Sequence, residues 1–273
     1  VIAQRVVTMQ LGWPRSFGSF EVGDPYVIKA FSETLRKLME KEGHLKEESF
    51  SEIFPKAGRI QEPIRNLIDN GLFFGSKIEL DSSSLKKRFM LNVANTKLPF
   101  MTWSAGQKEF MPLLLSFYHL MPPSKVSTRD AIKWVVIEEP EMGLHPLAIQ
   151  SLMVAFLELI ARGYKVVIST HSSVLLELAW AIQYIQTHQG ASKDVFELFG
   201  MPRNPSLDKT FKAVVTGKTF STFYFDRQAD GVHIKDISSL DPGSEDLAIA
   251  DWGGLTDFAS RAGAVVSKLA TND

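Results

Sequence analysis

Apolar and polar residues follow helical and β-like patterns in turn along the first half of the chain. Residues 1 to 9, rich in β-branched side chains, predict a short strand. Apolar positions recur at helical spacing from Tyr26 to about Lys41 and from Ile60 to Ile68. Two β-like runs follow, Leu72 to Leu80 and Leu85 to Val93, with an aspartate and three serines between them. This half therefore predicts helices beside a β-hairpin.

A strand, a helix and a second strand follow one another in the middle of the chain. Ile132 to Ile137 is a nearly continuous apolar run, as expected of a strand covered on both faces in a parallel sheet. Leu147 to Arg162 is amphipathic at helical spacing, and Lys165 to Ser169 is a second apolar strand. Because the unit has the length of a right-handed crossover, it predicts an α/β fold with a mostly parallel sheet flanked by helices.

The last third of the chain predicts smaller elements. Val174 to Ile185 has helical spacing, whereas residues 187 to 210 hold Gly, Pro, Asn and charges and predict a surface loop. Phe220 to Phe225 and Val232 to Ile237 flank an Ala-Asp-Gly turn, which indicates a hairpin. A terminal helix is predicted from Ala259 to Leu269.

Charge and composition narrow the possible partners. The 30 Lys and Arg residues nearly balance the 31 Asp and Glu residues, so the net charge of −1 provides no global attraction to nucleic acid or to an anionic membrane. Nucleic-acid binding is possible only through a local surface. The absence of cysteine excludes disulfides and cysteine nucleophiles and fits a reducing, cytoplasmic location. No apolar run has the length of a bilayer span, so we expect no membrane contact.

Polar groups follow both predicted parallel strands, where ligands of open parallel sheets bind. Glu138, Glu139 and Glu141 come directly after the first strand, and His171 comes after the second. If the strands are neighbours, Glu138, Glu139 and His171 converge on one edge. One carboxylate can then hold Mg²⁺, a second can polarise a water, and the histidine can contact a phosphoryl group. The alternative is a polar strand exit and a capped helix.

A third segment precedes an apolar helix that is predicted from about Gln107 to His119. The small residues Ser104, Ala105 and Gly106 would let backbone N–H groups approach a phosphate, which the positive end of the helix also favours. A serine followed three residues later by glutamine is equally typical of a simple helix cap.

These segments together resemble the ABC-type ATPases, in particular the RecF/SMC-like and overcoming-lysogenization-defect-like branch of AAA family ATPases. Ser104 to Gln107 is similar to the signature motif, and Trp134 to Glu139 to the Walker B strand with its following glutamate. Glu141 to Pro146 resembles the D-loop, and His171 falls where the switch histidine belongs. Order and spacing match the family over Leu98 to Ser173. Ile2 to Arg5 is loosely similar to a strand segment that ends in arginine.

The resemblance implies an ATPase that works with Mg²⁺ as a head-to-tail dimer, in which ATP lies between the P-loop of one subunit and the signature motif of the other. It implies that Glu138 helps to hold Mg²⁺, where most members have aspartate. It also implies that Glu139 is the general base and that His171 senses the γ-phosphate. The remaining implied site residues are Ser104, Ala105, Gly106 and Gln107 at the partner's nucleotide and Leu144, His145 and Pro146 at the dimer interface.

A P-loop is the part of this family's pattern that the sequence lacks. Gly217-Lys218-Thr219 is not preceded by the required first glycine, and an expected strand follows it. We therefore expect a P-loop NTPase head of the ABC type without its Walker A lobe, as the later part of a longer ATPase or as a partner half. The expected regions are a helical and β-hairpin region (1–97), the ATPase core (98–190), and a loop, hairpin and helix of the same head (191–273).

Three functions remain open at this stage. The first is an ATPase subunit acting in DNA repair or phage defence, as a homodimer or with an ATPase partner that supplies the P-loop. The second is a degenerate scaffold that dimerises without hydrolysis. The third is the nucleotide-binding cassette of a transporter, which the Glu-Pro-Glu and Leu-His-Pro segments disfavour because such cassettes usually carry Asp-Glu-Pro-Thr and Ala-Leu-Asp there.

Overall fold

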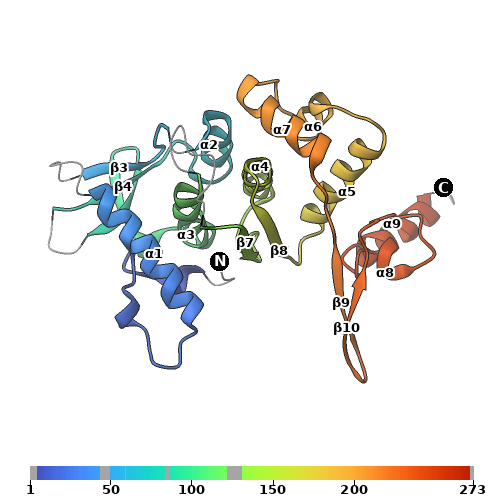
Figure 1. Ribbon diagram of the computed structural model, residues 1–273, viewed down its shortest axis with the longest axis horizontal. Coiled ribbons are helices and arrows are strands. Elements are labelled where there is room, and N and C mark those ends of the chain that lie inside the picture. Colours follow the sequence, from blue (N-terminus) through green and yellow to red (C-terminus); the bar gives the residue numbers. More distant parts are fainter. Residues whose placement is uncertain (1–4, 44–49, 59, 84–86, 122–130, 271–273) are drawn as a thin grey trace. The chain divides into compact units, whose positions relative to one another are not determined.

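The computed structural model describes residues 5–43, 50–58, 60–83, 87–121 and 131–270 (Figure 1). The chain divides into two compact units, Val1–Ser169 and Thr170–Asp273, which we call the N-terminal unit and the C-terminal unit. The boundary falls inside the range 98–190 that the motifs predict as the ATPase core.

In its described residues the N-terminal unit contains short 3₁₀ segments, a π-helical turn, four α-helices, two antiparallel sheets and a pair of parallel strands. In chain order its elements are η1 (Arg5–Thr8), β1 (Met9–Gln10), β2 (Trp13–Pro14), η2 (Phe17–Ser19), α1 (Tyr26–Gly43), β3 (Phe50–Phe54), α2 (Glu62–Ile68), η3 (Asp69–Phe73), β4 (Lys77–Asp81), β5 (Arg88–Val93), β6 (Thr96–Pro99), η4 (Phe100–Thr102), α3 (Ala105–Leu120), β7 (Trp134–Glu138), α4 (Pro146–Arg162) and β8 (Lys165–Ser169).

The predicted hairpin is confirmed as part of a four-stranded antiparallel sheet in the order β3-β4-β5-β6. Ile78 pairs with Leu91 and Leu80 with Phe89, and all four side chains are buried. The prediction of a strand from Leu72 is wrong at its start. Leu72 belongs to the π-helical turn η3, which continues α2 and has left-handed Phe74 (φ 51°) at its end. Residue 85, where the second run was predicted to begin, lies outside the described residues.

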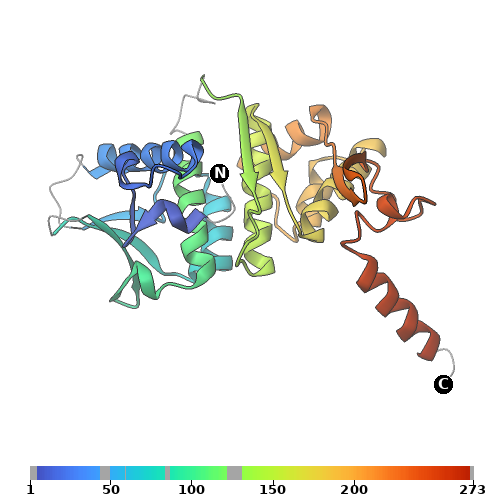
Figure 2. The same ribbon diagram turned by 90° about the horizontal axis from the view of Figure 1, so that it is seen from below.

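The parallel pair β7–β8 confirms the strand–helix–strand prediction, but the prediction of a mostly parallel sheet is wrong. Every other strand pair among the described residues is antiparallel. Figure 2 shows β7 and β8 side by side with α4 alongside. Val135 and Ile137 are buried, whereas Trp134 and Val136 are 59% and 51% exposed. The continuous apolar run therefore has one covered face in place of the expected two.

The first predicted strand is also wrong. Residues 1–4 lie outside the described part, and Arg5 to Thr8 form the 3₁₀ helix η1, in which the Thr8 hydroxyl donates to the Arg5 carbonyl oxygen (2.6 Å). Only Met9 and Gln10 are extended, and they pair with β2. The buried Arg5 side chain holds this segment against the rest of the unit. The β-propensity of the residues does not predict such burial.

The C-terminal unit confirms three predictions, namely α5, the β9–β10 hairpin and α9, although β9 begins at Phe223 and not at the predicted Phe220. The loop predicted for 187–210 is wrong, because α6 and the start of α7 fall inside it. Asn204 caps α7 by accepting from the Ser206 N–H (2.9 Å), and Pro205 opens the helix. The elements of the unit are α5 (Ser173–Thr187), α6 (Ser192–Leu198), α7 (Pro205–Gly217), β9 (Phe223–Gln228), β10 (Gly231–Asp236), α8 (Leu247–Ala250) and α9 (Asp257–Ala270).

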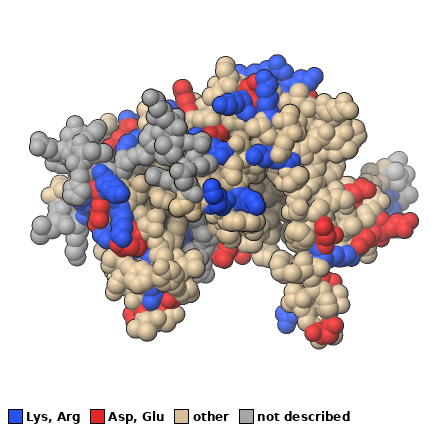
Figure 3. Space-filling view, in the orientation of Figure 1, with Lys and Arg blue, Asp and Glu red and all other residues tan. Residues whose placement is uncertain are grey.

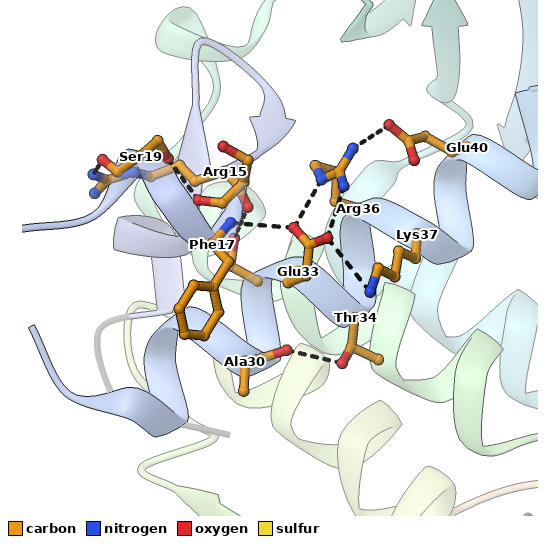
Figure 4. A network of polar contacts seen from close by, with 11 residues as sticks. Arg15, Phe17, Ser19, Ala30, Glu33, Thr34, Arg36, Lys37 and Glu40 are labelled. Carbon is orange, nitrogen blue, oxygen red and sulfur yellow. Dashed lines mark hydrogen bonds and ion pairs between the residues drawn. The ribbon is translucent and has the colours of Figure 1, made fainter.

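A polar network on α1 joins the helix to the loop before it (Figure 4). The Arg36 guanidinium donates to Glu33 Oε2 (2.9 Å) and Oε1 (2.7 Å) and also contacts Glu40. The Phe17 N–H donates to Glu33 Oε2 (3.1 Å). Mainly through Arg36, these contacts lower the pKa of Glu33 from 4.5 to about 2. The loop is thus held to α1 by an ionised carboxylate.

Both basic and acidic side chains lie on the face of the molecule that Figure 3 shows. Among the described helices, none combines the length and the apolar character that crossing a bilayer demands.

Candidate functional site

The end of β7 carries the first group of predicted site residues. Glu138 is the last residue of β7, is exposed, and lies opposite Ser169, the last residue of β8. The Glu139 N–H donates to the Ser169 carbonyl oxygen (2.9 Å), which prolongs the pairing by one residue. The two strands are thus neighbours and end together. His171 is exposed and belongs to the C-terminal unit, so its convergence with the carboxylates stays a prediction.

Glu139 has a left-handed backbone, with φ at 39°. For a residue with a long side chain this conformation costs roughly 1–3 kcal/mol, and such strain gathers at functional sites. A tight turn follows, in which the Met142 N–H donates to the Glu139 carbonyl oxygen (3.1 Å) and the Leu144 N–H to that of Glu141 (2.9 Å). At Glu139 the chain therefore leaves the direction of β7.

The segment before α3 forms a complete capping box. The Gln107 N–H donates to Ser104 Oγ (3.2 Å), and the Ser104 N–H donates to Gln107 Oε1 (3.1 Å). The Gln107 side chain also donates to the Leu72 carbonyl oxygen (3.1 Å). The helix cap, which was one of the two interpretations of this segment, is therefore present. It leaves Ser104 and Ala105 exposed at the positive end of a long helix.

The signature-like and D-loop-like segments touch each other within the N-terminal unit. A Cβ atom on Gly106 would lie 2.5 Å from the Gly143 carbonyl oxygen and 3.3 Å from a methyl group of Leu144. Gly143 has φ at 71°, a conformation that favours glycine. The two segments are 37 residues apart in sequence, and both need glycine at their contact.

His145 and Pro146 begin helix α4. His145 is its N-cap and accepts the Leu147 N–H at Nδ1 (3.3 Å), and Pro146 takes the first helical position. Both residues are exposed, and Leu144 is half-buried. This placement leaves His145 and Pro146 available for contact with another molecule.

The sequence did not indicate Glu109 as a site residue, and Arg5 was noted only at the end of a segment loosely similar to a strand of the family. Arg5 is fully buried, and its guanidinium contacts the main chain of Glu109, Glu138 and Glu139. Burial lowers the pKa of Arg5, while Glu109, Glu141 and Glu139 oppose that shift. A glutamate inside the apolar run of α3 was the available signal, since an acid at such a position calls for a buried partner.

The carboxylates fit a magnesium ion that is completed by a ligand. Among the described residues no group of three or more His, Cys, Asp or Glu side chains gathers as a metal site. Mg²⁺ is commonly held by one or two carboxylates together with substrate phosphates, and Glu138 at the strand exit can supply one such carboxylate. Gly217-Lys218 offers no phosphate loop, because Gly217 ends helix α7 whereas a P-loop joins a strand to a following helix.

Comparison with known sequences identifies the family. The family described as "AAA domain, putative AbiEii toxin, Type IV TA system" matches residues 30–177, which is more than half of the chain. The chain belongs to this AAA domain family. The matched range includes every predicted site residue from Ser104 to His171, so the family assignment and the site concern the same part of this AAA domain protein.

One relative of this AAA domain protein is the Old nuclease of Escherichia phage P2. The two are 31% identical over 80 residues, which is 29% of this chain and 14% of the relative. Family and relative together support the RecF/SMC-like ATPase resemblance. No solved structure matches the chain.

Proposed function

We propose that this AAA domain protein hydrolyses ATP as a RecF/SMC-like ATPase that acts as a head-to-tail dimer. The observation that carries the proposal is the contact of Gly106 with Gly143. It joins the signature-like helix start to the loop that leaves the Walker B-like strand. Two motifs with separate roles in an ATPase thus form one local structure, which chance resemblance of isolated segments does not explain.

In the proposed mechanism, Glu138 holds Mg²⁺, which neutralises phosphate charge when bound. Glu139 accepts a proton from the attacking water, and its left-handed backbone sets the direction of its carboxylate. His171 contacts the γ-phosphate. The ATP lies between a P-loop, which this sequence lacks and an ATPase partner supplies, and the signature motif of the opposing subunit.

The signature-like segment contributes to the other subunit's nucleotide in this proposal. Ser104, Ala105, Gly106 and Gln107 lie at the start of α3, where an anion is favoured. Leu144, His145 and Pro146 contact the partner subunit. Because Leu144 follows Gly143, which lies against Gly106, the proposed interface is next to the start of α3.

We further propose that hydrolysis drives work on nucleic acid in DNA repair or phage defence, within the cytoplasm. The support is the similarity to a phage protein that is named as a nuclease, the Old nuclease of phage P2. Since the sequence carries nearly equal numbers of basic and acidic residues, DNA contact would rest on a local surface or on a partner.

The test uses the full-length protein and its Glu139→Gln variant. The wild type should hydrolyse ATP with Mg²⁺, and Glu139→Gln should bind MgATP, lose more than about tenfold in kcat, and accumulate as an ATP-bound dimer in light scattering. Glu197→Gln, an exposed glutamate on α6, is the matched control and should behave as wild type. A protein that dimerises without binding MgATP would be a scaffold, and the ATPase proposal would be wrong.

A further inference from the structure

Arg5 is the most unusual charged residue of the N-terminal unit, since its side chain has no exposed surface. Arginine is almost never fully buried unless it is paired. Its Nε donates to the Glu109 carbonyl oxygen (3.0 Å), and its Nη1 donates to the carbonyl oxygens of Glu138 (2.9 Å) and Glu139 (3.3 Å). One guanidinium therefore joins η1, helix α3 and the exit of β7.

The two carbonyl groups that Arg5 holds flank the strained position. They belong to the last residue of β7 and to the left-handed residue after it. The planar guanidinium donates in fixed directions, so it defines the orientation of both peptide groups at once. The peptide orientation at Glu139 in turn decides where the Glu139 side chain points.

Glu109 holds the other side of Arg5. Its carboxylate accepts the Val6 N–H (3.2 Å), and Oε2 lies 4.0 Å from Arg5 Nε. Glu109 lies on α3 one turn beyond Gly106, and it is itself buried. The segment that carries Arg5 is thus fastened to the signature-like helix by main-chain and side-chain contacts.

We infer that Arg5 is a positioning residue that sets the backbone of Glu138 and Glu139 and couples it to the start of α3. The inference rests on the proposed function. An apolar side chain could fill the same space without the desolvation that a buried cation requires. A lysine keeps the charge but lacks the planar fork that reaches Glu109 and the strand exit together.

The experiment compares Arg5→Lys and Arg5→Met in the full-length protein. Arg65 provides the matched control, because its guanidinium also donates to a main-chain carbonyl, that of Ile60 (3.1 Å), on a different element. Amide hydrogen exchange is measured over residues 136–145 and over β4–β5, and kcat and KM for ATP are measured in parallel.

We expect Arg5→Lys to raise exchange over residues 136–145 by about tenfold, the effect of losing a hydrogen bond to a charged group. Exchange in β4–β5 should stay unchanged, and kcat should fall by about tenfold with little change in KM. Arg65→Lys should change neither quantity. Arg5→Met should enlarge the same local effect, and Arg5→Lys keeps the test informative if the Met variant does not fold.

Two results would overturn the inference. One is exchange that rises throughout the unit, or equally in the Arg65 variant, which describes a general packing role. The other is unchanged exchange over residues 136–145 or an unchanged kcat in a protein that hydrolyses ATP. If the wild type neither binds nor hydrolyses ATP, the proposed function fails, while the exchange pattern still decides whether Arg5 orders this turn.

Discussion

At the scale of single residues, the contact between Gly106 and Gly143 sets a narrow steric limit. A Gly106→Ala methyl group would lie 2.5 Å from a backbone carbonyl oxygen, which cannot rotate away as a side chain can. We expect a loss of roughly 1–3 kcal/mol in the free energy of unfolding, measured by urea denaturation.

Gly263 provides the control for that substitution. It lies inside α9, and a Cβ atom there meets nothing within 4 Å. Gly263→Ala should be neutral or should stabilise by about 0.5–1 kcal/mol through helix propensity. Equal stability of the Gly106→Ala and Gly263→Ala variants would show that the loop at Gly143 moves aside without a loss of stability.

Glu33 gives a prediction about pH at the same scale. Its pKa is lowered to about 2, chiefly by the hydrogen bond from Arg36, so its stabilising effect is complete above pH 4.5 and is lost as the pH falls towards 2. Glu33→Gln should therefore lower stability by roughly 1 kcal/mol at pH 7, because partial exposure screens the pair. The difference between the two proteins should shrink as the pH falls from 4.5 to 2 and should vanish below pH 2.

Urea midpoints between pH 7 and pH 2 measure this difference. Glu21→Gln removes an exposed carboxylate from the same part of the chain and is the control. A difference between Glu33→Gln and the wild type that stays constant down to pH 2 would mean that the carboxylate charge has no part in holding the loop.

At the scale of elements, the predictions succeeded where one pattern dominates a segment. β7, α4 and β8 were placed within about two residues because long apolar runs end at clear breakers such as Gly163, which has φ at 103°. Helix α6 was missed because its 7 residues are too few for a clear helical period. The start of α7 was missed because its cap residues are typical of loops. Asn204 and Pro205 indicate a loop by composition, yet they begin α7, whose Leu207 and Phe211 are buried.

The cap of α7 can be tested directly. Asn204→Ala removes the acceptor of the Ser206 N–H and should cost about 1 kcal/mol of stability, whereas Asn204→Asp keeps an acceptor and should be nearly neutral. Chemical denaturation followed by circular dichroism measures both variants. Equal loss in the two would show that packing at this position, and not capping, stabilises the start of the helix.

At the scale of the whole molecule, the candidate site combines short motifs with distant contacts. The motifs were visible in sequence because each is a few residues long and their order is fixed. The contacts of Arg5 could not be predicted, because its partners Glu109 and Glu138 lie 104 and 133 residues away. The prediction of two covered sheet faces failed for a related reason, since a local apolar run does not specify how many neighbours its strand finds.

The capping box at Ser104 also competes with anions for the main-chain N–H groups at the start of α3. The hydroxyl of Ser104 and the amide of Gln107 already satisfy two of the main-chain N–H groups there. An incoming anion that needs these donors must displace the cap, at a cost of about 1 kcal/mol. Simple anions at low concentration therefore bind weakly at this helix end. A polyphosphate makes several contacts, which can outweigh the loss of the cap. The capping box thus favours multivalent ligands over simple anions.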